Sequence, residues 1–192
     1  MTRAIGTLFL VLGIIAALVT GVALVFPESA QSLYSFALPH IAPVERQTST
    51  TAPQKIAEGN PIGVIEIPRL GLSSVVLEGD EEAALLFGVG HLADTPLPWL
   101  TVRGGNSVFA AHRDTFFRGL EAIRPKDVIR FRAGSTELEY RVKETKIVEP
   151  TDVAVLAPTR TSTLTLITCY PFRYVGPAPR RFIVRAERIS RT

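Results

Sequence analysis

The sequence predicts a mainly β protein, a closed or nearly closed antiparallel barrel with a few short helices, preceded by one N-terminal transmembrane helix. Three observations lead to this fold class. An uncharged apolar run occupies residues 4–26, seven short strand-like segments lie beyond residue 62, and only two short segments of the same region have helical character. Many short strands separated by Gly, Pro and Asn, with few helices, are typical of closed all-β architectures.

The N-terminal apolar run reads "AIGTLFLVLGIIAALVTGVALVF" and contains no charged side chain. A membrane-spanning helix needs about 20 apolar residues, whereas the apolar region of a signal peptide is about 7–15 residues long. This length favours an uncleaved anchor over residues 1–26; a cleaved signal peptide, with a weak site near Ala30, is the alternative. Arg3 precedes the run and Glu28 is the first charge after it, so the positive-inside rule predicts a cytoplasmic N-terminus.

Everything after the anchor is then expected outside the cytoplasm. Residues 27–61 are expected to form a stalk and linker, because the stretch "PVERQTSTTAPQKIAEGNP" is polar and rich in Thr, Pro and Ala. Residues 62–192 are expected to form one folded domain, and their number is common for a domain. The protein is therefore predicted to be a single-pass protein of the cell membrane with an extracytoplasmic domain.

Strand signals dominate the folded domain. Runs of apolar and β-branched residues predict strands at 63–67, 73–77, 107–112, 127–132, 137–148, 163–169 and 182–189. The acidic residues from Asp80 to Glu82 predict the start of a short helix that continues to Phe87, since carboxylates suit a helix N-terminus. The segment "FFRGLEAI", residues 116–123, predicts another helical turn.

Charge and composition exclude several classes of function. The net charge is +3, and the 21 basic and 18 acidic residues are spread along the chain. No basic stripe with interleaved aromatic residues is present, so nucleic-acid binding has no support. The sequence has no close Cys/His ligand spacing and no Gly-rich phosphate loop, so it predicts neither a metal site nor a nucleotide site.

The single cysteine, Cys169, ends the predicted strand 163–169 in the stretch "STLTLITCYPF". Side chains alternate across a strand, so Leu164, Leu166 and Thr168 share one largely apolar face that we expect in the core. Cys169 falls on the more polar face. A lone cysteine has no internal disulfide partner, so it is a small buried hydrophobe, half of an intermolecular disulfide, or a reactive thiol.

An arginine is expected beside this cysteine. If the strands 163–169 and 182–189 form a hairpin, Arg181 lies at the same edge as Cys169. A guanidinium there is able to hold a substrate carbonyl, stabilise an oxyanion or favour a thiolate. The plain alternative is a solvated surface charge.

A thiol nucleophile usually has a base or ion-pair partner, most often a histidine. The chain has three histidines. His40 lies in the predicted stalk, His91 follows a Gly-bracketed turn in "FGVGHL", and His112 ends a strand-like run in "NSVFAAHRDTFF". The strand-end position favours His112.

Together these segments resemble the sortase family. The sequence "TLITC", followed by "RRFIVRA", resembles the sortase Thr-Leu-x-Thr-Cys motif with an arginine five positions before a small residue, here Arg181 before Ala186. The segment "AAHRDTFFRGL" resembles the sortase histidine segment in its class D-like form, with Ala111 where the family more often has Gly. "IGVIEIPRLGL" and "GVGHL" resemble earlier barrel segments, so the resemblance spans about residues 62–189.

The resemblance implies an eight-stranded barrel and a membrane-anchored cysteine transpeptidase. Cys169 would attack the threonine carbonyl of a Leu-Pro-x-Thr-like C-terminal sorting signal, and an amine from a cell-wall precursor or a protein lysine would resolve the thioacyl-enzyme. His112 would act as acid and base. Arg181 would bind signal carbonyls and stabilise the oxyanion, and Thr168 would help to shape the site.

Three further residues are weaker candidates for the substrate groove. Tyr170 either walls the groove or packs on the barrel. His91 either lines the groove or has a structural role. Asp114 either orients His112 or its neighbour Arg113, or is a solvated carboxylate. No cofactor is expected to be required, although some sortases bind calcium with carboxylates that the fold brings together, so calcium dependence stays open.

Two other functions compete with this one. An L,D-transpeptidase would also be an extracytoplasmic thiol enzyme, but the Ser-His-Gly-Cys signature of that family is absent. A non-catalytic, membrane-tethered barrel that binds a partner would use Cys169 for an intermolecular disulfide.

Overall fold

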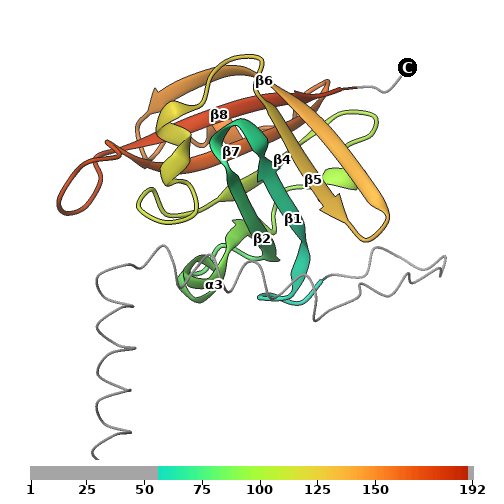
Figure 1. Cartoon of the computed structure of the whole chain (residues 1–192), viewed down its shortest axis with the longest axis horizontal. Coiled ribbons are helices and arrows are strands. Elements are labelled where there is room, and N and C mark those ends of the chain that lie inside the picture. The colour runs from blue at the N-terminus through green and yellow to red at the C-terminus, as the bar shows by residue number, and fades with distance from the viewer. Residues whose placement is uncertain (1–55, 190–192) are drawn as a thin grey trace, which may run out of the picture.

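Eight strands close into a barrel in the order β1–β2–β3–β4–β7–β8–β6–β5 (Figure 1). The structure is a computed structural model, and it describes residues 56–189. The strands are β1 (Pro61–Ile67), β2 (Leu72–Glu78), β3 (Val89–His91), β4 (Gly105–Ala110), β5 (Val128–Ala133), β6 (Thr136–Val148), β7 (Ser162–Tyr170) and β8 (Arg180–Arg188). The predicted closed, mainly β barrel is confirmed.

Two of the eight strand pairings are parallel, β2 with β3 and β4 with β7, so the barrel is not purely antiparallel as the sequence predicted. Parallel neighbours need a crossover connection. The segment with helix α3 (Glu82–Phe87) joins β2 to β3, and the β5–β6 hairpin lies in the connection between β4 and β7. Helix α3 confirms the predicted helix at residues 80–87.

Strand β3 is the strand that the sequence analysis missed. Its three residues, Val-Gly-His, are too few for any periodicity, and its position depends on pairing with β2 on one side and β4 on the other. Gly90 is needed there because a Cβ atom on it would lie 2.5 Å from the carbonyl oxygen of Gly79. Strand β3 is therefore made by tertiary contact.

Four 3₁₀ helices complete the described part: η1 (Pro68–Leu70), η2 (Pro98–Leu100), η3 (Arg118–Ala122) and η4 (Val153–Leu156). The helical turn predicted at residues 116–123 corresponds to η3. An ion pair joins η1 to the start of β5, where Arg69 Nε lies 2.5 Å from Asp127 Oδ1. Hydrogen bonds from the Arg69 side chain lower the pKa of Asp127 below its usual range.

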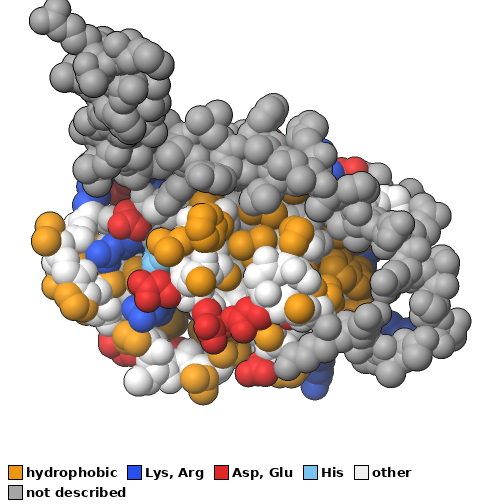
Figure 2. All heavy atoms as spheres, turned by 90° about the horizontal axis from the view of Figure 1, so that it is seen from below, with side chains coloured by type: hydrophobic (Ala, Val, Ile, Leu, Met, Phe, Trp, Pro, Cys, Tyr) orange, Lys and Arg blue, Asp and Glu red, His pale blue; other side chains and the backbone are white. Residues whose placement is uncertain are grey.

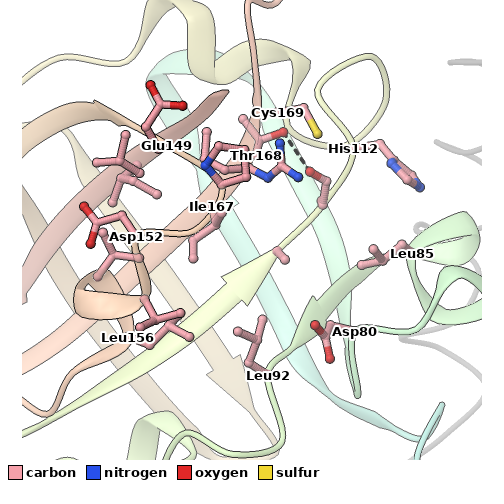
Figure 3. Close-up of a pocket in the computed structure, with 18 residues that line it drawn as sticks. Asp80, Leu85, Leu92, His112, Glu149, Asp152, Leu156, Ile167, Thr168 and Cys169 are labelled. Carbon is pink, nitrogen blue, oxygen red and sulfur yellow. Dashed lines mark hydrogen bonds between the residues drawn. The ribbon is translucent and has the colours of Figure 1, made fainter. Parts of the chain in front are cut away.

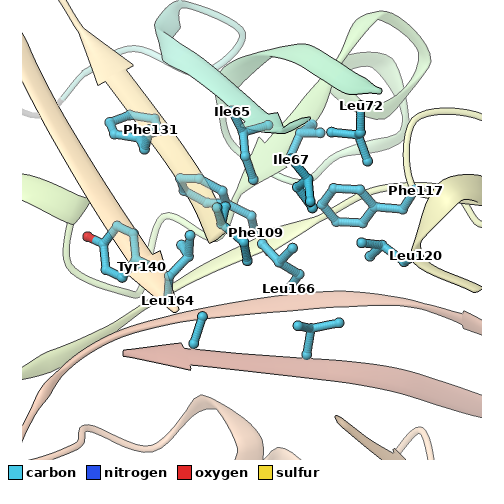
Figure 4. Close-up of a cluster of buried hydrophobic side chains, with 14 of the residues drawn as sticks. Ile65, Ile67, Leu72, Phe109, Phe117, Leu120, Phe131, Tyr140, Leu164 and Leu166 are labelled. Atoms are coloured by element: carbon cyan, nitrogen blue, oxygen red, sulfur yellow. The ribbon is translucent and has the colours of Figure 1, made fainter. Parts of the chain in front are cut away.

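The barrel interior is filled by aromatic and aliphatic side chains (Figure 4). Phe109 and Phe131 pack with ring centroids 5.6 Å apart, and Leu164 and Leu166 of β7 are fully buried beside them, as the alternation predicted. Each such side chain contributes about 1.5–3 kcal/mol on burial. The inner face of β7 is thus anchored firmly, and this holds the strand that carries Cys169.

The outer face of β7 is also covered, which the sequence analysis did not expect. The side chain of Asn106 in β4 accepts a hydrogen bond from the Thr165 hydroxyl at 2.6 Å. Its amide nitrogen donates to the carbonyl oxygens of Val155 and Ala157, at 2.9 and 3.3 Å. These bonds hold the connection with η4 against the outside of β4 and β7. Thr165 is therefore buried, although it lies on the polar face of the strand.

Within residues 56–189, no helix has the length and apolar character needed to cross a bilayer. The anchor predicted at residues 1–26 and the stalk residues 27–55 lie outside the described residues.

Candidate active site

A groove of about 420 Å³ runs along the outer surface of the barrel where β4 and β7 end and β8 begins (Figure 3). Its floor includes Ile167 and Cys169 of β7. One wall is the connection from Glu149 through η4, and the opposite side includes Asp80, Leu85 and Leu92. The groove thus has a mixed apolar and acidic lining over the end of the cysteine strand.

Cys169 and Arg181 lie directly opposite each other in the antiparallel β7–β8 pair. The hairpin predicted from sequence is therefore confirmed, and both residues line the groove. Cys169 is a free, half-buried thiol. Half-burial leaves its sulfur accessible from the groove, which the reading of Cys169 as a buried packing residue did not predict.

His112 reaches the same groove through the parallel pairing of β4 with β7. Ala110 of β4 is paired with Ile167, and two further residues along both chains lead to His112 and Cys169. Figure 3 shows both side chains at this end of the groove. The half-exposed His112 lines the groove, whereas the sequence separates it from Cys169 by more than fifty residues.

One face of the molecule carries acidic, basic and hydrophobic side chains close together, with a histidine side chain among them (Figure 2). His112 is half-exposed and lines the groove, so a substrate bound in the groove is able to reach its side chain.

Thr168 joins the two strands that carry Cys169 and His112. Its hydroxyl donates a hydrogen bond of 2.7 Å to the carbonyl oxygen of Ala111, the residue before His112 (dashed line, Figure 3). Thr168 also lines the groove, but it is only 2% exposed. The hydrogen bond from Thr168 fixes the backbone before His112. Thr168 is thus able to shape the site, as predicted, through this bond.

The Arg181 guanidinium contacts the backbone of its own strand and of the preceding loop. Its Nη1 atom donates to the carbonyl oxygens of Ala178 and Arg180, at 3.3 and 3.2 Å. Within residues 56–189, no hydrogen bond joins the Cys169 thiol to His112 or to Arg181. Catalytic hydrogen bonds are often long or unformed until the substrate is bound, so this geometry is compatible with thiol chemistry.

His91 does not line the groove, and its prediction as a substrate-binding residue is wrong. It is 1% exposed, and its Nδ1 atom lies 2.8 Å from Glu78 Oε2. Its Nε2 atom lies 3.2 Å from the hydroxyl of Thr95, and its ring packs edge-on against Phe109. The segment predicted as a Gly-bracketed turn is in fact the buried strand β3. Both ring nitrogens of His91 therefore have partners inside the protein.

Asp114 does not orient His112 or Arg113. Its side chain is exposed, it does not line the groove, and no hydrogen bond within the described residues links it to either neighbour. The solvated-carboxylate alternative therefore describes Asp114.

Tyr170 packs on the barrel and does not line the groove. Its ring stacks on Phe182 with centroids 6.3 Å apart and meets the edge of Phe172 at 6.1 Å. Both phenylalanines pack against the core. The substrate-binding prediction for Tyr170 is thus replaced by a packing role, because its side chain lies on the strand face opposite to Cys169.

The η4 wall is the part of the site that sequence reasoning missed. It contributes Asp152, Val153, Val155 and Leu156 to the groove. A signal was present, because Asp152 before "VAVL" is a typical helix cap, and its carboxylate accepts a hydrogen bond of 3.1 Å from the Ala154 backbone. No cluster of three metal-ligating side chains was found within residues 56–189.

A free thiol at a strand end, an arginine directly opposite and a histidine just beyond the end of β4 line one groove, an arrangement compatible with thiol acyl transfer. The chain belongs to the sortase family, because the family model described as a Sortase domain matches residues 65–189.

The chain is 34% identical over 145 residues to Sortase D of Bacillus subtilis (strain 168), and the match covers 75% of this chain and 72% of that protein. It is also similar to the solved Clostridium perfringens Sortase D5 transpeptidase, with a TM-score of 0.62 and 27% identity over 71% of this chain and 84% of that one. Sortase C from Clostridium perfringens SM101 has a TM-score of 0.63 and 31% identity, covering 74% of this chain and 78% of that one. The chain is therefore a cysteine transpeptidase, and a class D-like assignment is consistent with these relatives.

Proposed function

We propose that this transpeptidase cleaves a Leu-Pro-x-Thr-like C-terminal sorting signal through a thioacyl-enzyme on Cys169 and transfers the protein to an amine. The observation that carries the proposal is the cross-strand pairing of Cys169 with Arg181 in a groove that His112 also lines. A related Clostridium perfringens sortase C, 30% identical with a TM-score of 0.63, was solved with the C-terminal cell wall sorting motif. A signal of the same kind is proposed for this chain.

In the first half-reaction, the sulfur of Cys169 attacks the threonine carbonyl carbon of the signal. The carbonyl oxygen gains negative charge, and the Arg181 guanidinium stabilises it after exchanging its backbone partners for the substrate. The peptide C–N bond then breaks, and His112 donates a proton to the departing amine. The products are a thioester on Cys169 and a free C-terminal fragment.

In the second half-reaction, the incoming amine attacks the thioester carbonyl carbon. His112 accepts a proton from this amine, the C–S bond breaks, and the sulfur of Cys169 leaves as the thiolate. A new amide bond joins the protein to the acceptor. A single histidine serves both steps because its proton is given in the first and regained in the second.

The groove walls support an apolar, extended peptide as the substrate. Val153 and Leu156 of η4 and Leu92 of the opposite side line the groove. Val153 is 71% exposed without a substrate, and it buries apolar area when a leucine or proline side chain binds. Apolar walls with a few placed polar groups are the usual form of a ligand site.

We further propose that residues 1–26 anchor the enzyme in the cell membrane, with a cytoplasmic N-terminus. Of the linker predicted at 27–61, residues 27–55 are proposed to separate the anchor from the catalytic domain, because Ile56 packs against the core and Pro61 begins β1. The uncharged apolar run supports the anchor. The proposed acceptor is an amine of a cell-wall precursor or a protein lysine. Activity is proposed to require no cofactor, which assays with and without a calcium chelator test.

The proposal is tested with the full-length chain in detergent, a Leu-Pro-Gln-Thr-Gly peptide and a primary-amine acceptor. Mass spectrometry should detect a thioester on Cys169 and an amide product with wild type, and neither with Cys169→Ala. Equal cleavage by wild type and Cys169→Ala contradicts the mechanism. A dimer on non-reducing gels that disappears in Cys169→Ser, without peptide cleavage by wild type, supports the disulfide-linked scaffold instead.

A further inference from the structure

We infer that Arg113 is a positioning residue that holds the β7–β8 loop (residues 171–179) and thereby sets the place of Arg181 relative to His112. This inference rests on the proposed roles of Cys169, His112 and Arg181, and it adds a residue to which the mechanism above gives no part. Arg113 directly follows His112 in the chain, and the loop it contacts lies between Cys169 and Arg181. The loop projects from the end of the β7–β8 hairpin (Figure 1).

Arg113 makes three contacts with this loop. Its Nη2 atom donates hydrogen bonds to the carbonyl oxygens of Tyr174 and Gly176, at 2.9 and 3.1 Å. Its guanidinium carbon lies 5.7 Å from the centroid of the Tyr174 ring, within the range of a cation–π contact. A planar guanidinium makes both kinds of contact at once, which a lysine ammonium does less well.

The same loop also holds Arg181. The Arg181 guanidinium donates to the carbonyl oxygens of Ala178 and Arg180. The two arginines therefore bind four alternate carbonyl groups of one backbone segment, from Tyr174 to Arg180. One of these arginines is adjacent to His112 and the other lines the groove, so the segment connects the two sides of the site.

The Arg181 contacts are weak enough to be exchanged. At 3.2 and 3.3 Å, they lie at or beyond the long end of the usual N–H···O range. A substrate carbonyl is therefore able to replace them at little cost. The position of the loop then determines where the Arg181 guanidinium lies before it binds the substrate carbonyl.

The Arg113 contacts suit a positioning role better than a purely stabilising one. The Nη1 atom of Arg113 is buried and has no hydrogen-bond partner among the described residues, which reduces what the side chain contributes to stability. At the loop tip, Tyr174 is 48% and Val175 is 98% exposed, so apolar packing does little to hold the tip. Three prolines, Pro171, Pro177 and Pro179, limit backbone freedom in the loop. A stiff loop transmits the position of the side chain that holds its tip.

Removal of the Arg113 side chain should therefore displace Arg181 without displacing His112. The Thr168 hydroxyl bond to Ala111 holds the backbone before His112, and Arg113 takes no part in it. The η4 wall that supports signal binding is held by the Asn106 side chain, and Arg113 takes no part in those bonds. The expected result is a slower chemical step with unchanged binding of the signal.

The test uses the full-length chain in detergent and three variants: Arg113→Ala, Arg113→Lys and the control Arg173→Ala. Arg173 lies in the same loop, is 89% exposed and makes one ion pair of 3.6 Å with Glu121. Cleavage of the folded protein by chymotrypsin after Tyr174 should accelerate by about tenfold or more in Arg113→Ala, since the two hydrogen bonds that hold this segment are lost, and should not change in Arg173→Ala. An unchanged cleavage rate in Arg113→Ala overturns the inference, whether or not any sorting peptide is cleaved.

The second measurement is kcat and KM with the sorting peptide, normalised to titrated thiol. Arg113→Ala should lower kcat by about 10–100-fold with KM within about twofold of wild type, Arg113→Lys should recover part of the loss, and Arg173→Ala should match wild type. A raised KM with normal kcat, or a lowered melting temperature with normal kcat, overturns the positioning role. Failure of wild type to cleave any sorting peptide overturns the proposed function. The first measurement does not depend on that function, so the two failures are distinguishable.

Discussion

His91 and His112 lie on neighbouring strands or just beyond them, and the barrel uses them in opposite ways. His91 ends β3, where it is buried, and its two ring nitrogens lie against Glu78 and Thr95. His112 follows the end of β4, is half-exposed and lines the groove beside Cys169. An imidazole with both nitrogens occupied is fixed in place, whereas proton transfer requires a nitrogen that the substrate reaches. The comparison shows that accessibility, more than residue type, separates a structural from a catalytic histidine.

The largest expected effect is loss of catalysis at the groove histidine. His112→Gln removes the proton donor and acceptor, so kcat should fall by about 10²–10⁴-fold. Because His112 is half-exposed, the melting temperature of the variant should remain close to that of wild type. Peptide cleavage followed by chromatography and a thermal melt measure both quantities. Activity within twofold of wild type would remove the assignment of His112 as the acid and base.

The buried histidine should give the reverse result. His91→Ala leaves the buried Glu78 side chain without its 2.8 Å hydrogen-bond partner, which costs about 1–3 kcal/mol, and the cavity left by the ring adds to this loss. Urea unfolding should show this loss, while kcat per titrated thiol stays within about twofold of wild type. The double variant with Glu78→Gln is the matched control and should recover part of the stability. A large fall in kcat with normal stability would show that His91 acts in the site.

A smaller effect is expected from loss of the hydrogen bond between Thr168 of β7 and Ala111, the residue before His112. Thr168→Val keeps the shape of the side chain but removes the hydroxyl that donates to Ala111. The buried carbonyl is left without this bond, so stability should fall by about 1–3 kcal/mol. The backbone before His112 also loses one of its two hydrogen bonds to β7 and keeps only the longer bond from Ala111 N–H to Ile167, so kcat should fall by about tenfold. Thr168→Ser keeps the hydroxyl and should retain activity; equal loss in both variants would mean that the methyl group, not the bond, matters.

The smallest effect concerns an ion pair outside the groove, which contrasts with the buried pair at His91. Hydrogen bonds from Arg69 lower the folded-state pKa of Asp127, so the pair stabilises the protein above the unfolded pKa of about 3.9. This stability is lost as the pH falls through the lowered folded-state pKa. Asp127→Asn should therefore destabilise the protein at pH 6 and flatten its stability curve below about pH 4, as measured by urea unfolding. If the free energy of unfolding of this variant fell with pH below about pH 4 as steeply as that of wild type, the Arg69–Asp127 pair would not contribute to acid stability.

Local pattern was sufficient for most of the barrel. Seven strands, the short helix α3 and the inward face of Leu164 and Leu166 were predictable from alternation and from boundary residues. The hairpin that pairs Cys169 with Arg181 was predictable because it joins strands that are neighbours in the sequence. Strand β3 was not, since three residues carry no periodicity.

The roles of the weaker candidates depended on contacts between distant segments. Tyr170 has an apolar ring with a polar tip, and only the positions of Phe172 and Phe182 show that it packs on the barrel. The η4 wall is placed by Asn106, which lies more than forty residues earlier in the chain. Such contacts have no local signature.

The sequence by itself determined the barrel class, the cysteine at a strand end and the arginine opposite it, because alternation and hairpin pairing are local properties of the chain. The tertiary structure decided that His112, and not His91, shares a groove with Cys169. The parallel pairing of β4 with β7 brings His112 to Cys169, and the insertion of β3 between β2 and β4 buries His91. Both events join segments that are far apart in sequence, and they follow from the closure of the barrel around its core.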